Sequence, residues 1–202
     1  MASRSSFGRP AGGGRRGGRD REPPDDGPPE PPADPEQVAR QICLHQLEFA
    51  PRTRAELAAT LAKRGVPDDV ADAVLGRFAE VGMIDDALFS QMWVTSRHRG
   101  RGLSGRALQQ ELRRKGVDDE TARTALDTLS ADEERATAQS LVARKLPATR
   151  GLTPDARVRR LAGMLARKGY SAGLAFAVVR EALAAEGAEV EIGFDELQAL
   201  DD

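Results

Sequence analysis

Arginine and lysine gather in one short stretch, residues 97–115, which reads RHRGRGLSGRALQQELRRK and carries seven basic residues and one acid. A second stretch, residues 144–168, carries eight basic residues and one acid. Guanidinium groups and flexible glycines approach phosphate oxygens closely, so these residue types indicate polyanion binding. The candidate binding residues are Arg97, Arg99, Arg101, Arg106, Arg113, Arg114, Lys115, Arg157, Arg160, Arg167 and Lys168.

The spacing of the basic residues predicts that they share a face. Arg106 and Arg113 are seven residues apart, or two helical turns, and Arg157, Arg160 and Arg167 make a similar stripe. Arg97, Arg99, Arg101 and Arg106 are expected in or beside a glycine-rich loop. Two acidic blocks, 68–86 with net charge −5 and 118–134 with net charge −6, alternate with the basic ones. We therefore expect one basic face and a separate acidic face.

Other polar residues have simpler structural interpretations. The paired carboxylates Asp85 and Asp86 are expected to cap the backbone N–H groups of a helix that begins near Asp86. His45 lies among apolar residues and is expected in or beside the core, whereas His98 is a weak candidate for the basic loop. Cys43 and Trp93 are expected in the core. No phosphate loop, nucleophile elbow or zinc-ligand spacing is present in the sequence, so we expect no enzyme, metal or cofactor.

The elements that position these residues follow from a threefold repeat. Three segments, TLAKRGV at 60–66, ELRRKGV at 111–117 and MLARKGY at 164–170, share a pattern of leucine, any residue, two basic residues, glycine and an apolar residue. Glycine after the last turn adopts the left-handed conformation that closes a helix. Basic residues in the last turn complement the helix dipole. The repeat therefore explains most of the basic pair without invoking a binding site.

The pattern predicts an all-α fold of three tandem three-helix repeats in an elongated, curved body. The expected units are 35–84, 85–130 and 131–186, between a disordered Arg/Gly/Pro-rich tail at 1–34 and an acidic tail at 187–202. The expected helices span 35–49, 53–64, 67–81, 86–98, 104–115, 118–130, 131–145, 154–168 and 171–186. Thr53 and Ser130 are expected to begin capping boxes, and Pro154 to occupy a first helical position.

Composition sets further bounds. The chain has one cysteine and no run of 18 apolar residues, which predicts a cytoplasmic protein that does not enter a membrane. Residues 35–185 carry 24 basic and 19 acidic residues, whereas 186–202 carry seven acids and no basic residue. The acidic end is either a solubilising tail or a segment that folds onto the basic face as a nucleic-acid mimic. The first 34 residues are either a solvated tail or a weak nucleic-acid contact.

The combination of these motifs resembles the RecX family, the bacterial regulators of the RecA recombinase. The resemblance lies in the repeated L-x3-L-x-basic-basic-G-[VY], in IDD-x2-F at 84–89, and in the glycine-rich pattern at 97–117; it covers about 36–185. It implies a helical monomer, without a catalytic centre or cofactor, that docks in the groove of the RecA filament on single-stranded DNA. Blocked filament extension and lower ATPase, strand-exchange and coprotease activities would follow.

Two other functions stay open from the residues alone. Short helices with arginine at their ends also occur in helix-turn-helix proteins, which bind a specific duplex sequence. A helical adaptor that binds another protein through apolar grooves is the second. The resemblance implies weak, sequence-blind binding of single-stranded DNA with a strong salt dependence, whereas an adaptor would bind in a salt-tolerant way.

Overall fold

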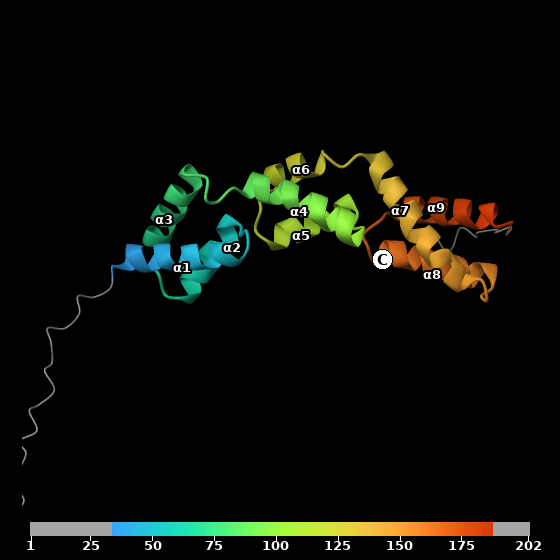
Figure 1. Cartoon of the computed structure of the whole chain (residues 1–202), viewed down its shortest axis with the longest axis horizontal. Coiled ribbons are helices and arrows are strands. Elements are labelled where there is room, and N and C mark those ends of the chain that lie inside the picture. The colour runs from blue at the N-terminus through green and yellow to red at the C-terminus, as the bar shows by residue number, and fades with distance from the viewer. Residues whose placement is uncertain (1–33, 188–202) are drawn as a thin grey trace, which may run out of the picture. The chain divides into compact units, whose positions relative to one another are not determined.

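The computed structural model describes residues 34–187, and these form nine α-helices, one short 3-10 helix and no strand (Figure 1). The predicted tails, 1–34 and 187–202, lie outside the described residues except for Asp34 and Gly187. The all-α prediction is confirmed, with every predicted helix present. The helices are α1 (Pro35–Phe49), α2 (Arg54–Lys63), α3 (Asp68–Glu80), α4 (Asp86–Arg101), α5 (Gly105–Arg114), α6 (Asp119–Leu126), α7 (Ala131–Lys145), η1 (Leu146–Thr149), α8 (Pro154–Ala166) and α9 (Ala172–Ala185).

Side-chain caps begin most of these helices. Thr53 Oγ1 accepts from Glu56 N at 3.2 Å, and a Glu56 carboxylate oxygen accepts from Thr53 N at 3.3 Å. Ser130 begins the second predicted capping box, and Asp85 caps α4 by accepting from Leu88 N at 2.8 Å. Such caps satisfy N–H groups that have no partner within the helix. These boundaries therefore follow from local residue types.

One helix is longer than predicted, and this moves the candidate loop. α4 continues to Arg101 and ends at Gly102, which has φ 64° and donates its N–H to His98 O at 2.8 Å. Arg97 and Arg99, which were predicted in or beside a glycine-rich loop, lie instead in the last turns of α4, whereas Arg101 is its last residue and lies beside Gly102 as predicted. Gly100 does not interrupt the helix, since a single glycine costs a helix only about 1 kcal/mol.

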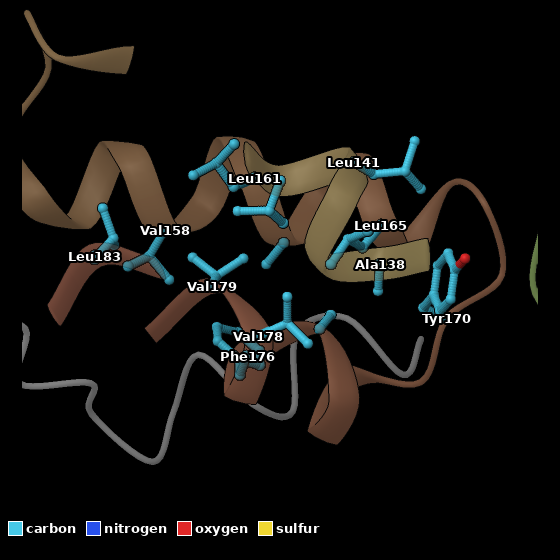
Figure 2. Close-up of a cluster of buried hydrophobic side chains, with 13 residues drawn as sticks. Ala138, Leu141, Val158, Leu161, Leu165, Tyr170, Phe176, Val178, Val179 and Leu183 are labelled. Atoms are coloured by element: carbon cyan, nitrogen blue, oxygen red, sulfur yellow. The ribbon is translucent and has the colours of Figure 1, made fainter. Parts of the chain in front are cut away.

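Each group of three helices encloses its own apolar cluster. The three clusters draw on α1–α3, on α4–α6 and on α7–α9, together with the apolar residue that follows each repeated glycine. Figure 2 shows the third cluster, where the leucines of α8 meet valines of α9 and Ala138 and Leu141 of α7. Burying one leucine contributes about 1.5–3 kcal/mol. The fully buried leucine pairs of the repeat are Leu57 and Leu61, Leu108 and Leu112, and Leu161 and Leu165. The residue limits proposed for the three units stay predictions, as do elongation and curvature.

Two hydrogen bonds involving Lys115, and the close approach of Gly116 to Ala55, join the first unit to the second. Thr53 Oγ1, at the start of α2, donates to Lys115 O at 2.6 Å, just beyond the end of α5. Lys115 Nζ donates to a Glu56 carboxylate oxygen at 2.7 Å. A Cβ at Gly116 would lie 2.3 Å from Ala55 Cβ, so only glycine allows this approach. We call this contact the first joint.

The second joint repeats the arrangement between the second and third units. Ser104 N, at the start of α5, donates to Lys168 O at 3.0 Å, just beyond the end of α8. A Cβ at Gly169 would lie 2.6 Å from both Ala107 Cβ and Ser104 Oγ. The Tyr170 hydroxyl donates to Gly102 O at 3.2 Å, and burial raises the pKa of Tyr170 to about 12. The repeated motif therefore closes a helix and also binds the preceding unit.

Single residues outside the joints give mixed outcomes. Cys43 is buried, as predicted, whereas the prediction for His45 is wrong because its side chain is 67% exposed on α1. His98 is buried and lies between Leu103 O and Thr137 Oγ1, each at 2.8 Å, so it ties α4 to α7. Asp86 accepts from Arg54 N at 2.9 Å, and burial raises the pKa of this carboxyl group.

Candidate polyanion-binding site

Three helix ends converge on a groove of about 760 Å³ at the second joint. The last turn of α4 supplies Arg101, the last turn of α7 supplies Arg144 and Lys145, and the end of α8 supplies Arg167 and Lys168. Basic residues suit these positions, because the C-terminal end of a helix carries a partial negative charge. We call these five residues and the cavity between them the basic groove.

The floor of the basic groove is apolar and its rim is cationic. Leu103, Leu141 and Met164 are the apolar lining residues, and no carboxylate lines the groove among residues 34–187. Lys168 Nζ donates to Arg101 O at 2.5 Å, which holds this lysine against α4. Such a surface suits a ligand with negative charges and some apolar area.

Smaller cavities extend the cationic surface in three directions. One of about 350 Å³ adds Arg99 beside Arg144, and one of about 240 Å³ adds Arg160 beside Lys145 and Arg167. A third, of about 400 Å³, adds Arg106 and Arg114 beside Arg167, with Glu111 as its acidic member. Arg167 lines three of the four cavities, and Arg144 lines the basic groove and the fourth, so the four cavities adjoin one another.

Most of these cations lack an ion-pair partner within the part of the chain that the structure describes. The ion pairs found there leave out Arg99, Arg101, Arg106, Arg114, Arg144, Lys145, Arg160 and Arg167. All eight are exposed to solvent. An unpaired surface cation releases more free energy on meeting a phosphate than one that must first leave a carboxylate.

Three predicted binding residues are instead neutralised by carboxylates. Arg97 lies 3.8 Å from a Glu111 carboxylate oxygen, and its guanidinium stacks 4.1 Å from the Trp93 ring centroid. Arg113 donates to Asp119 at 2.7 Å, and this contact lowers the pKa of the Asp119 carboxyl group. Lys115 belongs to the first joint. The structure does not bring these residues into the basic groove.

The predicted stripe on α8 is also only partly present. The expectation that Arg157 lies on an outward face is wrong, because only 8% of Arg157 is exposed to solvent. Its guanidinium pairs with Glu186 and donates to Thr149 Oγ1 at 3.0 Å. The helical repeat predicted the stripe correctly for Arg160 and Arg167 but did not reveal the contacts that bury Arg157.

Sequence reasoning missed Arg144 and Lys145 as site residues. Both lie in the last turn of α7 and line the basic groove. The signal was present, because the second basic stretch begins at residue 144. Only the approach of the end of α7 to the ends of α4 and α8 distinguishes them from ordinary helix-ending cations.

Fold and site together define a class: an all-helical repeat protein with a cationic groove. Residues 34–187 contain no cluster of His, Cys, Asp and Glu that could hold a metal ion, and no helix among them is long and apolar enough to cross a membrane. Family models describe the same three units. They match residues 39–78 as RecX, first three-helix domain, 85–126 as RecX, second three-helix domain, and 132–179 as RecX, third three-helix domain.

The chain belongs to the RecX family. It is 59% identical over 169 residues to regulatory protein RecX of Thermobifida fusca, covering 82% of this chain and 91% of that protein. It is 57% identical over 162 residues to regulatory protein RecX of Streptomyces coelicolor, covering 80% of this chain and 86% of that protein. The predicted family is therefore confirmed, and with it the role of a regulatory protein.

Solved structures support the fold independently. The crystal structure of RecX from Lactobacillus salivarius superposes with a TM-score of 0.68 at 18% identity, covering 74% of this chain and 97% of that chain. A second crystal structure, described as regulatory protein RecX, gives a TM-score of 0.65 at 19% identity, with 74% and 73% covered. Helix arrangement is thus retained where most residues differ.

Proposed function

We propose that this protein inhibits the RecA recombinase by docking on its filament on single-stranded DNA, and that the basic groove makes the docking contact. Family membership supports RecA as the target. The observation that carries the site is the convergence of Arg101, Arg144, Lys145 and Arg167 on one cavity without a lining carboxylate.

The physical basis is electrostatic. A filament on DNA presents phosphates and charged protomer surfaces along its length, and each phosphate that a cation neutralises releases condensed counterions. The exposed arginines at the ends of α4, α7 and α8 can contact successive anionic groups. The apolar floor of the groove adds contact area that does not depend on salt. A docked chain then covers the surface that an incoming protomer needs, which lowers extension, ATPase, strand exchange and coprotease activity.

RecA ATPase on single-stranded DNA, measured with increasing amounts of this protein, tests the proposal. We expect inhibition by the natural sequence and about tenfold weaker inhibition by the double variant Arg144→Glu, Arg167→Glu, a loss of about 1.4 kcal/mol. Neither side chain takes part in an ion pair among residues 34–187, so the change should not unfold the protein.

The matched control is Arg123→Glu, Arg180→Glu. Both residues are exposed, lie on α6 and α9, and line none of the four cavities. The control changes net charge by the same amount and is expected to inhibit normally. Equal inhibition by both folded variants would remove the basic groove from the proposal.

The two remaining functions make different predictions in a binding titration. A sequence-specific duplex regulator would prefer one duplex over a random one, and an adaptor would bind in high salt and ignore the arginine changes. We expect single-stranded DNA binding that is weak, independent of sequence and steeply weakened by salt. Duplex preference or salt tolerance would favour the alternatives.

A further inference from the structure

The acidic C-terminal stretch of the chain begins at one end of the cationic surface. Glu186, directly after α9, accepts from Arg150 at 3.0 Å and pairs with Arg157 of α8. Arg157 in turn donates to Thr149 Oγ1 at 3.0 Å. The first acid of the stretch is therefore already bound to two arginines of the third unit.

A continuous lining leads from this anchor to the basic groove. Thr149 lines the cavity of about 240 Å³ together with Lys145, Arg160 and Arg167. Lys145 and Arg167 also line the basic groove. A chain that leaves Glu186 along this path meets only cationic, apolar or hydroxyl-bearing side chains.

The sequence after Gly187 matches this surface in composition. Residues 188–202, AEVEIGFDELQALDD, carry six acids and no basic residue. Three apolar residues, Val190, Ile192 and Phe194, alternate with acids or glycine in its first half. The basic groove offers the complement, a cationic rim over Leu103, Leu141 and Met164.

We propose that residues 188–202 bind the basic groove of their own chain and compete there with the polyanion. This rests on the proposed function of the groove. The length suffices: 15 residues reach up to about 50 Å, whereas ten residues of α8 from Arg157 to Arg167 rise about 15 Å. Tethering gives such a segment an effective concentration on the order of millimolar, so a weak contact blocks weak ligands and yields to a polyvalent filament.

Zero-length carbodiimide cross-linking of the full-length protein tests the contact without RecA or DNA. The sequence holds four lysines, of which Lys145 and Lys168 line the basic groove while Lys63 and Lys115 do not. We expect intramolecular cross-links from acids of 189–202 to Lys145 or Lys168, and their loss in Arg144→Glu, Arg167→Glu. Cross-links to Lys63 in equal yield, or none to the groove lysines, would overturn the proposal.

The competition is tested by the affinity of a fluorescent oligothymidylate at low salt. The full-length variant Glu189→Gln, Glu191→Gln, Asp195→Asn, Glu196→Gln is expected to bind severalfold more tightly than the natural sequence. The control Glu48→Gln, Glu80→Gln, Glu120→Gln, Asp127→Asn alters net charge equally at four exposed sites on the helical units. Equal tightening in both would overturn the competition, since overall charge would then explain it.

The two experiments separate this inference from the proposed function. Groove cross-links in a protein that does not inhibit RecA would reject the RecA proposal and retain the intramolecular contact. Inhibition of RecA without such cross-links would retain the RecA proposal and reject the intramolecular contact.

Discussion

Basic residues that look alike in the sequence have different contacts in the structure. Lys115 and Lys168 occupy the same repeat position, and the backbone carbonyl of each accepts a hydrogen bond from the start of the preceding unit's second helix. Arg144 and Arg167 have exposed side chains that line the basic groove. The side chains of both lysines are also held, Lys115 by Glu56 and Lys168 by Arg101 O, whereas Arg114 and Arg167 have no ion-pair partner among residues 34–187, so the repeated basic pair is partly a connector between units.

The joint glycines allow a matched test. Gly65 and Gly116 both have φ 75°, so alanine suffers the same left-handed strain, about 1–2 kcal/mol, at either position. Gly65 has nothing within 4 Å of an added Cβ, whereas at Gly116 that atom would meet Ala55 Cβ at 2.3 Å. We expect Gly116→Ala to lower the free energy of unfolding by about 1–3 kcal/mol more than Gly65→Ala, measured by urea denaturation. Equal losses would mean that the first joint accommodates the added methyl group without a further loss of stability.

At the scale of elements, the third unit differs from the first two at one position of the repeat, the residue four places before its first leucine. Thr53, Ser104 and Arg157 stand four residues before the first leucine of each repeat, and all three are buried. In the first two units this position is a helix cap that meets the next unit. In the third, α8 begins a turn earlier, at Pro154, and Arg157 is covered by Thr149 and Glu186. In the third unit, an ion pair thus occupies the place that a helix cap takes in the first two.

Acid should weaken this closure. Hydrogen bonds from Arg157 and Arg150 lower the pKa of Glu186 below its usual range. The stabilisation is therefore complete above the unfolded-state pKa and is lost as pH falls through the folded-state pKa. We expect Glu186→Gln to lower the melting temperature at neutral pH and to melt like the natural sequence at a pH below both values. A difference that persists undiminished into acid would assign the effect to something other than the carboxylate charge.

At the scale of the whole molecule, charge is sorted by helix end. The basic groove forms where three helices terminate, while acids concentrate in the first turns of α3, α6 and α7. Both placements favour the helix dipole, so folding and binding do not oppose each other here. Under the proposed function, the same sorting makes the affinity for a polyanion dependent on ionic strength.

The salt dependence of binding reports how many phosphate contacts the protein makes. For single-stranded DNA, the slope of log K against log salt concentration changes by about 0.7 for each phosphate contact. We expect Arg167→Met to reduce the steepness of this slope by about 0.7 or more, since Arg167 lines three cavities. Arg180→Met, on an exposed position of α9, should leave it unchanged. Identical slopes for both variants would place the phosphates elsewhere.

The sequence by itself determined the features that depend on near neighbours in the chain. Capping at Thr53 and Ser130, the helix-ending glycines and the buried leucine pairs all arise from hydrogen bonds and periodicity within a few residues. Tertiary structure decided which cations are free. Burial of Arg157 requires Glu186, 29 residues later, and the groove requires the ends of α4, α7 and α8 to meet. The spacing of charges along a helix does not encode such distant partners, because they are set by how helices pack within a unit and by how one unit lies on the next.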